Sequence, residues 1–299
     1  MTVDTAVTLN PAAQRTSGGE SGRCYRHVEV HRIAGALGAE IAGVDIAGPL
    51  DDEVVLEIRQ AFLDHLVIFF PNQALTPQQQ LAFARRFGEP MEYPQLKGLQ
   101  ECPLITPVIK EAHERVNFGG VWHSDTTYLA RPPMASMLYA VEIPPFGGDT
   151  LFANQYLAYE TLSDGLKEVL ARLTGVNTST KAEVSKTRED RLREAGVERK
   201  ALTGKHPVVR THPETGRKAL YINTGHTARF DGCTEEESAP LLDYLFQHQV
   251  RPEFTCRFRW ERGSLAFWDN RCAQHNPVND YHGYRRVMHR VTLAGDVPS

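Results

Sequence analysis

The chain has 299 residues, of which 41% are hydrophobic and 23% are charged, a composition typical of a folded protein rather than a disordered one. Its 33 basic and 37 acidic residues give a formal net charge of −4, so neither a nucleic acid nor an anionic membrane is expected as a partner. No apolar run approaches the ~20 residues that a membrane helix needs. The five scattered cysteines form no CxxC pair, which argues against a cysteine zinc site or a disulfide framework and favours the reducing cytoplasm.

The N-terminal third begins with a segment that is rich in Ser, Thr, Gly and Pro. We expect a disordered tail over 1–26, without a secretory signal, and one domain over 27–299. Acidic residues followed by apolar residues spaced by three and four predict an amphipathic helix, and Thr76 with Pro77 is typical of a helix start. The elements expected here are strands at 28–30, 40–44 and 67–70 and helices at 54–63 and 76–88.

The rest of the chain is mainly strand-like. Thr234 and Glu237 form a capping box that predicts the start of a late helix. The segment 181–205 is densely charged; it is either a solvated helix or loop, or a lid beside an active site, and 95–120 is a second lid-like segment. The elements expected here are strands at 134–143, 150–153, 254–262, 264–268 and 285–293, a helix at 156–173, and a hairpin of 208–211 with 219–222.

The order of these elements indicates the fold class. Strands dominate the C-terminal half and show no alternation of strand and helix. We therefore expect a mixed, β-dominated fold, a barrel or two-sheet jelly roll with helical insertions, and not a parallel doubly wound sheet.

One motif could bind a metal. His123 and Asp125 lie two positions apart, so in extended chain both side chains point to the same side. With His275 they would form the two-histidine, one-carboxylate facial triad of non-haem Fe(II) oxygenases. A pair of this kind also arises often by chance, so the motif alone is a weak signal.

Two arginines follow the third of these residues. Arg286 and Arg290 are four positions apart, so on a strand both face the same side, while Arg285 faces the other. A buried guanidinium is suited to a carboxylate or sulfonate because its N–H groups can bind two oxygens at once. The alternative is an exposed basic strand face.

Several segments together resemble one family. They are GAEIAGVD at 38–45, WHSDTTY at 122–128, PPFGGDT at 144–150, WDNR at 268–271 and RVTLAG at 290–295. In this order they are similar to the taurine dioxygenase (TauD/TfdA) group of Fe(II)- and 2-oxoglutarate-dependent oxygenases, which includes sulfonate, alkylsulfate and phenoxyalkanoate dioxygenases. The resemblance covers most of the chain and implies a double-stranded β-helix core of the jelly-roll, cupin-like type.

The resemblance also implies an activity and roles for particular residues. The enzyme would hydroxylate a small anionic substrate such as an alkyl sulfate, sulfonate, carboxylate or aryloxyalkanoate with O2, and release succinate and CO2. The implied roles are Fe(II) ligands for His123, Asp125 and His275, 2-oxoglutarate binding for Thr150 and Arg286, and substrate binding for Arg290, Tyr93, Tyr128 and Trp268. Tyr93 stands where sulfonate-using members have a histidine, which argues against taurine itself.

Other interpretations remain open at this point. Trp268 could be an ordinary core residue, Tyr93 a packed aromatic and His226 a surface histidine rather than a pocket residue. The enzyme could be a biosynthetic tailoring oxygenase for an amino-acid-derived or lipid-like substrate. A non-catalytic metal-binding jelly roll is a third reading. Family members are commonly dimers or tetramers, so a homodimer or homotetramer is expected.

Overall fold

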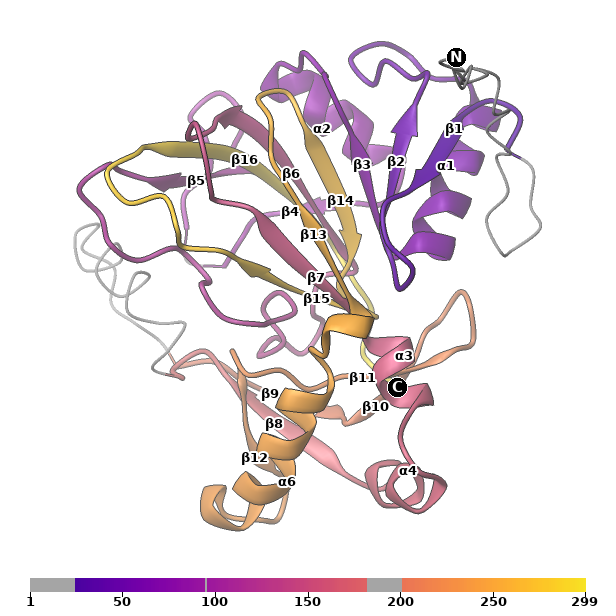
Figure 1. Cartoon of the computed structure of the whole chain (residues 1–299), viewed down its shortest axis with the longest axis vertical. Coiled ribbons are helices and arrows are strands. Elements are labelled where there is room, and N and C mark those ends of the chain that lie inside the picture. The colour runs from indigo at the N-terminus through magenta and orange to yellow at the C-terminus, as the bar shows by residue number, and fades with distance from the viewer. Residues whose placement is uncertain (1–24, 95, 182–200) are drawn as a thin grey trace, which may run out of the picture.

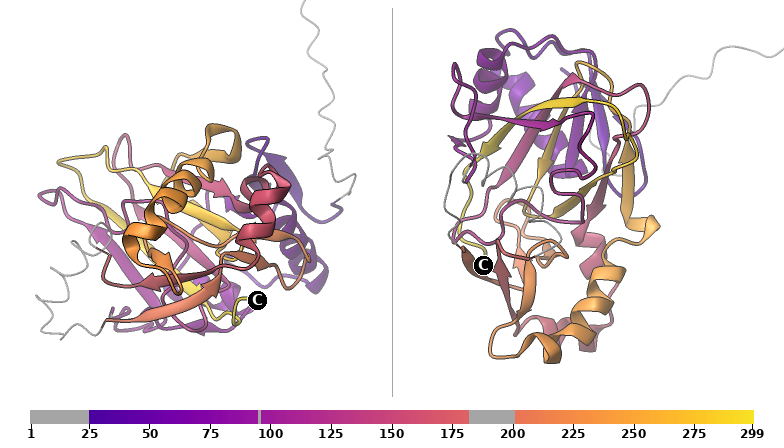
Figure 2. Two further views of the ribbon diagram at one scale, coloured as in Figure 1. Left: turned by 90° about the horizontal axis from the view of Figure 1, so that it is seen from below. Right: turned by 90° about the vertical axis from the view of Figure 1, so that its left-hand side faces the viewer.

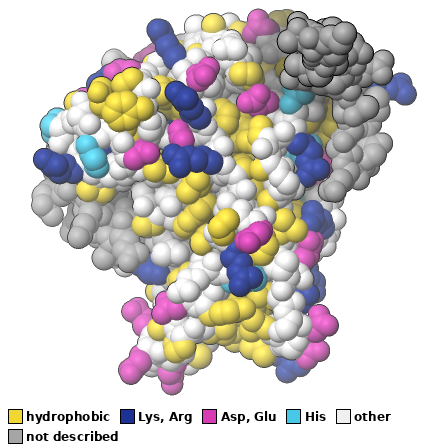
Figure 3. All heavy atoms as spheres, in the orientation of Figure 1, with side chains coloured by type: hydrophobic (Ala, Val, Ile, Leu, Met, Phe, Trp, Pro, Cys, Tyr) yellow, Lys and Arg dark blue, Asp and Glu magenta, His cyan; other side chains and the backbone are white. Residues whose placement is uncertain are grey.

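The computed structural model describes residues 25–94, 96–181 and 201–299. Residues 1–24 of the expected tail over 1–26 and 182–200 of the charged segment 181–205 therefore fall outside the described residues, and the end of the charged segment belongs to strand β9 (Thr203–Pro207). None of the described helices is long and apolar enough to cross a membrane. On the face drawn in Figure 3, basic and acidic side chains are interspersed, which agrees with the nearly balanced charge of the sequence.

The upper part of the molecule in Figure 1 is built on a large, mainly antiparallel sheet. Its order is β1-β2-β3-β14-β6-β16-β4, and β5 also pairs with β16. Its strands are β1 (Glu29–Arg32), β2 (Ala39–Ala42), β3 (Val67–Phe70), β4 (Pro90–Met91), β5 (Ile105–Lys110), β6 (Ala135–Glu142), β14 (Leu265–Asp269) and β16 (Arg286–Leu293).

A smaller sheet packs against one face of the large sheet. It consists of β13 (Thr255–Phe258), β7 (Thr150–Asn154) and β15 (Ala273–Pro277), in that order. Phe69 of the large sheet stacks on Phe258 of the small sheet with 3.9 Å between ring centroids. The two sheets enclose one hydrophobic core and form the expected jelly roll, which also holds the candidate site.

Helices cover the other face of the large sheet. They are α1 (Asp52–His65), with acidic residues in its first turn, and α2 (Pro77–Arg85), which Thr76 and Gln79 cap as a capping box. Phe62 of α1 stacks on Phe267 of β14 at 4.1 Å. Strand β3 is buried on both faces, because its side chains alternate between this helical layer and the small sheet. That placement explains its continuous apolar sequence.

The lower part of Figure 1, seen from two further sides in Figure 2, contains the remaining elements around a third apolar cluster. Strands β12, β8 and β9 form one sheet, and β10 pairs with β11 as the expected hairpin. The bounds are α3 (Gln155–Glu160), α4 (Asp164–Leu170), β8 (Thr174–Thr178), β9 (Thr203–Pro207), β10 (Val209–Thr211), β11 (Lys218–Leu220), β12 (Thr227–Phe230), α6 (Glu235–His248) and the 3₁₀ helix η1 (Pro252–Phe254).

Three expectations need correction. The single helix over 156–173 is two helices: α3 ends at Glu160 with Thr161 as its C-cap, and α4 begins at Asp164 with Ser163 as its N-cap. The backbone N–H and the hydroxyl of Thr161 both bond to the carbonyl of Leu157. The strand over 254–262 is only β13, preceded by η1. The segment 95–120 is not a loop throughout, because it contains β5, whose Pro107 hides the strand pattern.

Candidate metal centre and its surroundings

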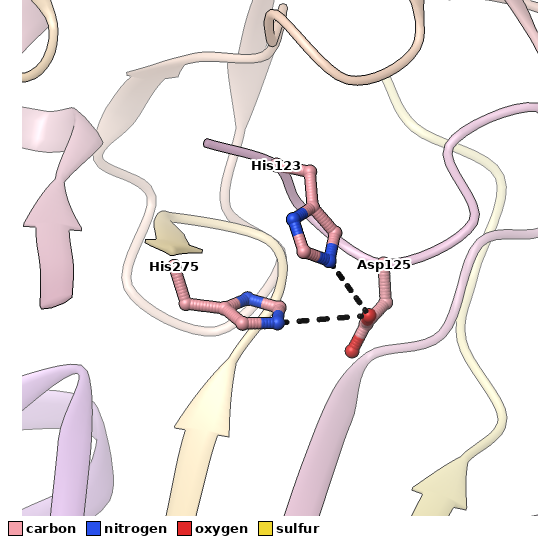
Figure 4. Close-up of side chains that lie close together, drawn as sticks. All are labelled: His123, Asp125 and His275. Atoms are coloured by element: carbon pink, nitrogen blue, oxygen red, sulfur yellow. Dashed lines mark ion pairs between the residues drawn. The ribbon is translucent and has the colours of Figure 1, made fainter. Parts of the chain in front are cut away.

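His123, Asp125 and His275 lie together between the two sheets (Figure 4). Nε2 of His123 is 3.7 Å from Oδ1 of Asp125, and Nε2 of His275 is 3.9 Å from the same oxygen. The backbones of His123 and His275 exchange two hydrogen bonds, of 3.0 and 2.9 Å. These two bonds attach the segment that follows 95–120 to β15, and so bring residues from distant parts of the chain into one cluster.

Hydrogen bonding determines which nitrogen of His123 is free to bind a ligand. Nδ1 lies 2.7 Å from the carbonyl oxygen of Val121. A carbonyl oxygen can only accept, so Nδ1 carries the proton and Nε2 keeps its lone pair. Gly119 packs on the same ring with a left-handed φ of 73°, and a Cβ at this position would lie 2.9 Å from Cε1 of His123.

Hydrogen bonds between buried polar side chains support the carboxylate of Asp125. Its Oδ2 accepts a 2.6 Å hydrogen bond from the hydroxyl of Ser136, which in turn accepts one from Asn270 at 3.1 Å. Oδ1 lies beside both imidazoles and forms an ion pair with Nη2 of Arg290. One carboxylate oxygen is therefore fixed by Ser136, while the other faces the two imidazoles and Arg290.

The protonation states suit a divalent cation. Burial lowers the pKa of both imidazoles, and for His275 the neighbouring His123 lowers it further. Burial alone would raise the pKa of Asp125, but Arg290 and the two histidines outweigh it and hold this pKa well below its usual range. Two neutral imidazoles and one ionised carboxylate are what a metal site requires.

Trp268 lies behind the ligands rather than in open space. Its ring centroid is 4.8 Å from that of His275, and its Nε1 donates a 2.9 Å hydrogen bond to Asn270. The side chain is 2% exposed and belongs to the core between the sheets. Trp268 therefore has the position expected of a core residue, and its ring contact with His275 supports the orientation of that imidazole.

Arg290 is the nearest cation to this cluster. Both Arg286 and Arg290 are 5% exposed, so the same-side spacing on β16 does place two arginines inside the protein. Nη2 of Arg290 forms an ion pair with Oδ1 of Asp125, and its guanidinium carbon lies 4.7 Å from the ring centroid of Tyr93. Nε of Arg290 has no hydrogen-bond partner among the described residues.

Tyr128 and His226 complete the side of the cluster nearest His123. Their rings meet edge-on with 5.0 Å between centroids, and His226 lies 6.0 Å from the ring of His123. His226 is 5% exposed, so it is a buried neighbour of the cluster and not a surface histidine. Tyr128 is almost fully buried, and Gly204 of β9 packs directly on its backbone.

Thr150 of β7 and Arg286 of β16 belong to different sheets and both contact Trp260. The hydroxyl of Thr150 accepts a 2.9 Å hydrogen bond from Nε1 of Trp260, and the guanidinium carbon of Arg286 lies 5.6 Å from the ring centroid of Trp260. Burial lowers the pKa of Arg286, although Tyr281 acts in the opposite direction. Nε and Nη2 of Arg286 are buried without hydrogen-bond partners in the described part of the chain.

Sequence reasoning missed several residues of this site. Ser136, Asn270 and Gly119 each act on a candidate ligand, and Trp260 joins Thr150 to Arg286. Of these residues, Asn270 alone carried a sequence signal, because it lies inside the WDNR segment that resembles the family. Its two-residue offset from Trp268 places both side chains on the inner face of β14 and the turn that follows it.

A second cluster could be mistaken for a metal site. His212, Asp269 and Cys272 are buried together. Nδ1 of His212 accepts from the backbone N–H groups of Glu214 and Thr215, and its Nε2 lies 3.0 Å from Asp269. Asp269 is also paired with Arg271 through both oxygens. These donors are already used within the protein, so the cluster is structural.

The residues of the first cluster fit Fe(II). A two-histidine, one-carboxylate set on one side of the metal is the donor set of non-haem Fe(II) oxygenases. Oδ1 of Asp125, which is paired with Arg290, and the free Nε2 of His123 and Nε2 of His275 lie close enough to one another to share one cation. The unpaired N–H groups of Arg286, beyond Thr150, suit the distal carboxylate of a keto diacid.

Comparison with known proteins identifies relatives along almost the whole chain. The family described as "Taurine catabolism dioxygenase TauD, TfdA family" matches residues 29–292. An alpha-ketoglutarate-dependent sulfate ester dioxygenase of Pseudomonas putida is 38% identical over 279 residues, which cover 91% of each chain. An alkylsulfatase of Acinetobacter baylyi is 36% identical over 91% of this chain and 86% of its own length. The crystal structure of a taurine dioxygenase from Burkholderia xenovorans superposes with a TM-score of 0.77 at 38% identity, covering 91% of each chain.

Proposed function

Because the chain belongs to the TauD/TfdA family and is a dioxygenase that uses Fe(II), 2-oxoglutarate and O2, we propose that its substrate is a small organic sulfate ester. The observation that carries this proposal is the buried guanidinium of Arg290 beside Asp125. A buried arginine next to the reacting centre selects a compact anion, and two relatives are a sulfate ester dioxygenase and an alkylsulfatase.

The residues divide into three tasks in this proposal. His123, Asp125 and His275 hold Fe(II), and Thr150 with Arg286 holds 2-oxoglutarate. Iron, 2-oxoglutarate and O2 together supply the oxidising power that converts a substrate C–H bond into C–OH, with release of succinate and CO2. Arg290 orients the anionic end of the substrate, so that the carbon next to the sulfate ester oxygen faces the metal.

The products follow from the position of oxidation. A hydroxyl group placed on the carbon that carries the ester oxygen makes an unstable adduct. The C–O bond to sulfate breaks, its electron pair leaves with sulfate, and the hydroxyl loses its proton to become an aldehyde. One alkyl sulfate, one O2 and one 2-oxoglutarate thus give one aldehyde, one hydrogen sulfate, one succinate and one CO2. A sulfonate would instead release sulfite, so the inorganic product distinguishes the two substrate classes.

The test is a coupled assay on the iron-loaded enzyme. Alkyl sulfates, alkyl sulfonates and aryloxyalkanoates are compared by the succinate that each produces, and inorganic sulfate is quantified in parallel. We expect equal amounts of succinate and sulfate from alkyl sulfates. Succinate formation that depends on a sulfonate or an aryloxyalkanoate, with no turnover of any sulfate ester, would overturn the proposal.

Two arginine variants test the anion-binding role. Arg290→Met should raise the KM for the sulfate ester, with a loss of about 100-fold in kcat/KM, because a buried charged partner is removed. Arg285→Met is the matched control: the neighbouring arginine is 41% exposed and pairs with Glu111 and Glu142. An unchanged KM in Arg290→Met would contradict the assignment of Arg290.

A further inference from the structure

A second buried cation lies beside Arg286. Lys110 ends β5 and is 4% exposed, and its Nζ has no hydrogen-bond partner among the described residues. Strand register places Lys110 directly opposite Arg286 on the neighbouring β16. Directly paired residues on adjacent strands point to the same face of the sheet, so both cations face the same space.

That space is a small pocket at the Thr150 end of the site. Its lining includes Lys110, Arg286, Asn117, Tyr281 and Pro277. Pro277 is the strand partner of Thr150, so the pocket adjoins the hydroxyl that we assign to 2-oxoglutarate. Nζ of Lys110 lies 4.5 Å from the ring centroid of Tyr281, whose hydroxyl donates a 2.8 Å hydrogen bond to Asn117.

Among the described residues, neither Lys110 nor Arg286 forms a salt bridge with a carboxylate. Like charges directly opposite each other on paired strands destabilise a sheet, and burial increases that cost. Asp149 is the acidic group that acts on Arg286, but it is paired at 2.6 Å with Arg257. Glu114 acts on Lys110 only through space, since it makes no salt bridge with it. Two buried cations with unpaired N–H groups therefore face a place suited to an anion.

We infer that Lys110 and Arg286 together hold the distal carboxylate of 2-oxoglutarate, with Lys110 as a second cationic anchor. This inference rests on the proposed 2-oxoglutarate-binding role of Arg286. Arg286 supplies a planar pair of N–H donors, and Lys110 supplies a point charge from the adjacent strand. The clamp selects a keto acid with a second carboxylate, and a keto monoacid such as 2-oxobutyrate lacks the group that it binds.

Binding without turnover tests this inference. Fe(II)-loaded protein is titrated with 2-oxoglutarate under anaerobic conditions, and the visible charge-transfer band reports the dissociation constant. Lys110→Met, which keeps the length of the side chain and removes its charge, should raise this constant tenfold or more, while Lys110→Arg should keep most of the affinity. Lys205→Met is the matched control, because Lys205 is a 58% exposed lysine that pairs with Asp231.

A keto monoacid separates the clamp from a general loss of structure. Lys110→Met should leave the weak binding of 2-oxobutyrate unchanged, so the preference for the diacid should shrink by the same factor. The 2-oxoglutarate-dependent rise in melting temperature should shrink too, whereas the melting temperature of the ligand-free protein should stay the same or rise. Lys110→Gln provides the same comparison if the methionine variant does not fold.

Two outcomes distinguish the inference from the proposal beneath it. Wild-type protein that shows no band with 2-oxoglutarate would overturn the assigned site and the clamp with it. A normal wild-type band, together with equal affinity of Lys110→Met and wild type for 2-oxoglutarate, would overturn the clamp alone.

Discussion

At the residue scale, one hydroxyl orients the candidate carboxylate ligand. Ser136 donates to Oδ2 of Asp125 and leaves Oδ1 toward the imidazoles. We predict that Ser136→Ala weakens Fe(II) binding by about 10- to 100-fold, the usual effect of losing a hydrogen bond that orients a ligand. Metal titration under anaerobic conditions measures this constant.

The control for Ser136 removes a hydroxyl far from the site. Ser238→Ala also deletes a buried hydroxyl that bonds to backbone groups, in α6. It should lower stability without changing the affinity for Fe(II). Equal metal affinity in Ser136→Ala and wild type would show that Asp125 needs no such support.

Gly119 makes a second residue-scale prediction. A Cβ at Gly119 would lie 3.2 Å from Nε2 of His123, the atom that would hold the metal, and φ there is left-handed. We predict that Gly119→Ala lowers Fe(II) affinity by more than tenfold. Gly216→Ala is a matched control, because Gly216 has a φ of 70° and no neighbour within 4 Å.

Both glycine variants should lose about 1 kcal/mol or more of stability through backbone strain. Only Gly119→Ala should lose metal affinity, since only its methyl group meets a ligand. The two variants are compared by thermal unfolding and by Fe(II) titration. Parallel losses of stability with equal metal affinity would contradict the role given to Gly119.

The sequence could predict the candidate ligands but not what supports them. The two-residue spacing of His123 and Asp125 and the four-residue spacing of the arginines are local, and local periodicity indicates which side chains share a face. Asn270 lies 145 positions from Asp125, and Ser136 and Asn270 meet across 134 positions. Contacts over such distances depend on strand order, which single-sequence patterns do not determine.

At the element scale, the alternation of side chains in and after β14 explains the WDNR segment. Trp268 and Asn270 face the metal cluster, while Asp269 and Arg271 face the opposite side and pair with each other. Arg271 also bonds to Glu214 at 2.7 Å, in the loop after β10. One short segment thus supports the site with two residues and fastens a neighbouring loop with the other two.

The same scale shows why some elements were predicted and others were not. Strand β3 and helices α1 and α2 carry strong local signals: an unbroken apolar run, an acidic first turn and a Thr–Pro helix start. Strand β5 carries a proline and lies in a polar region, so its pattern resembles a loop. It is a strand because β16 provides its hydrogen-bond partners, which only the folded sheet reveals.

Asp269 provides an element-scale prediction with a defined pH dependence. Burial alone would raise the pKa of Asp269, but Arg271 and His212 outweigh it, so this pKa is lowered on folding. A lowered pKa means that the ionised carboxylate stabilises the fold above about pH 4, its unfolded value, and that this stabilisation is lost as pH falls below it. Asp269→Asn should therefore lose about 3–5 kcal/mol near pH 7 and show a flatter decline in acid.

Chemical unfolding between pH 7 and pH 3 measures this effect. Asp243→Asn, at an exposed position on α6, is the control and should behave as wild type. A curve for Asp269→Asn that is parallel to the wild-type curve below pH 4 would show that the Asp269–Arg271 pair contributes no acid sensitivity.

At the scale of the whole molecule, the segment after β16 joins the jelly roll to the lower part in Figure 1. The backbone N–H of Thr211 donates to the carbonyl of Ser299 at 2.7 Å. Arg210 of β10 is fully buried, packs 4.7 Å from the ring of Tyr221, and bonds to Asp296 at 2.6 Å. The strand that carries Arg286 and Arg290 therefore continues directly into a segment that anchors the β10–β11 hairpin.

This connection leads to a prediction about stability. Asp296→Ala leaves the guanidinium of Arg210 buried without its carboxylate, so we expect a loss of about 1–3 kcal/mol, moderated because Asp296 is half-exposed. In the double variant Arg210→Met, Asp296→Ala, much of this loss should be recovered, because no uncompensated charge remains.

The comparison pair is Arg217–Glu160, which has the same 2.6 Å separation but side chains that are 44% and 45% exposed. Glu160→Ala should cost less than about 1 kcal/mol. For each pair, urea unfolding of the wild type, the two single variants and the double variant gives the coupling energy between the two residues. Equal coupling energies for the buried and the exposed pair would show that burial of Arg210 does not make the terminal segment a structural anchor.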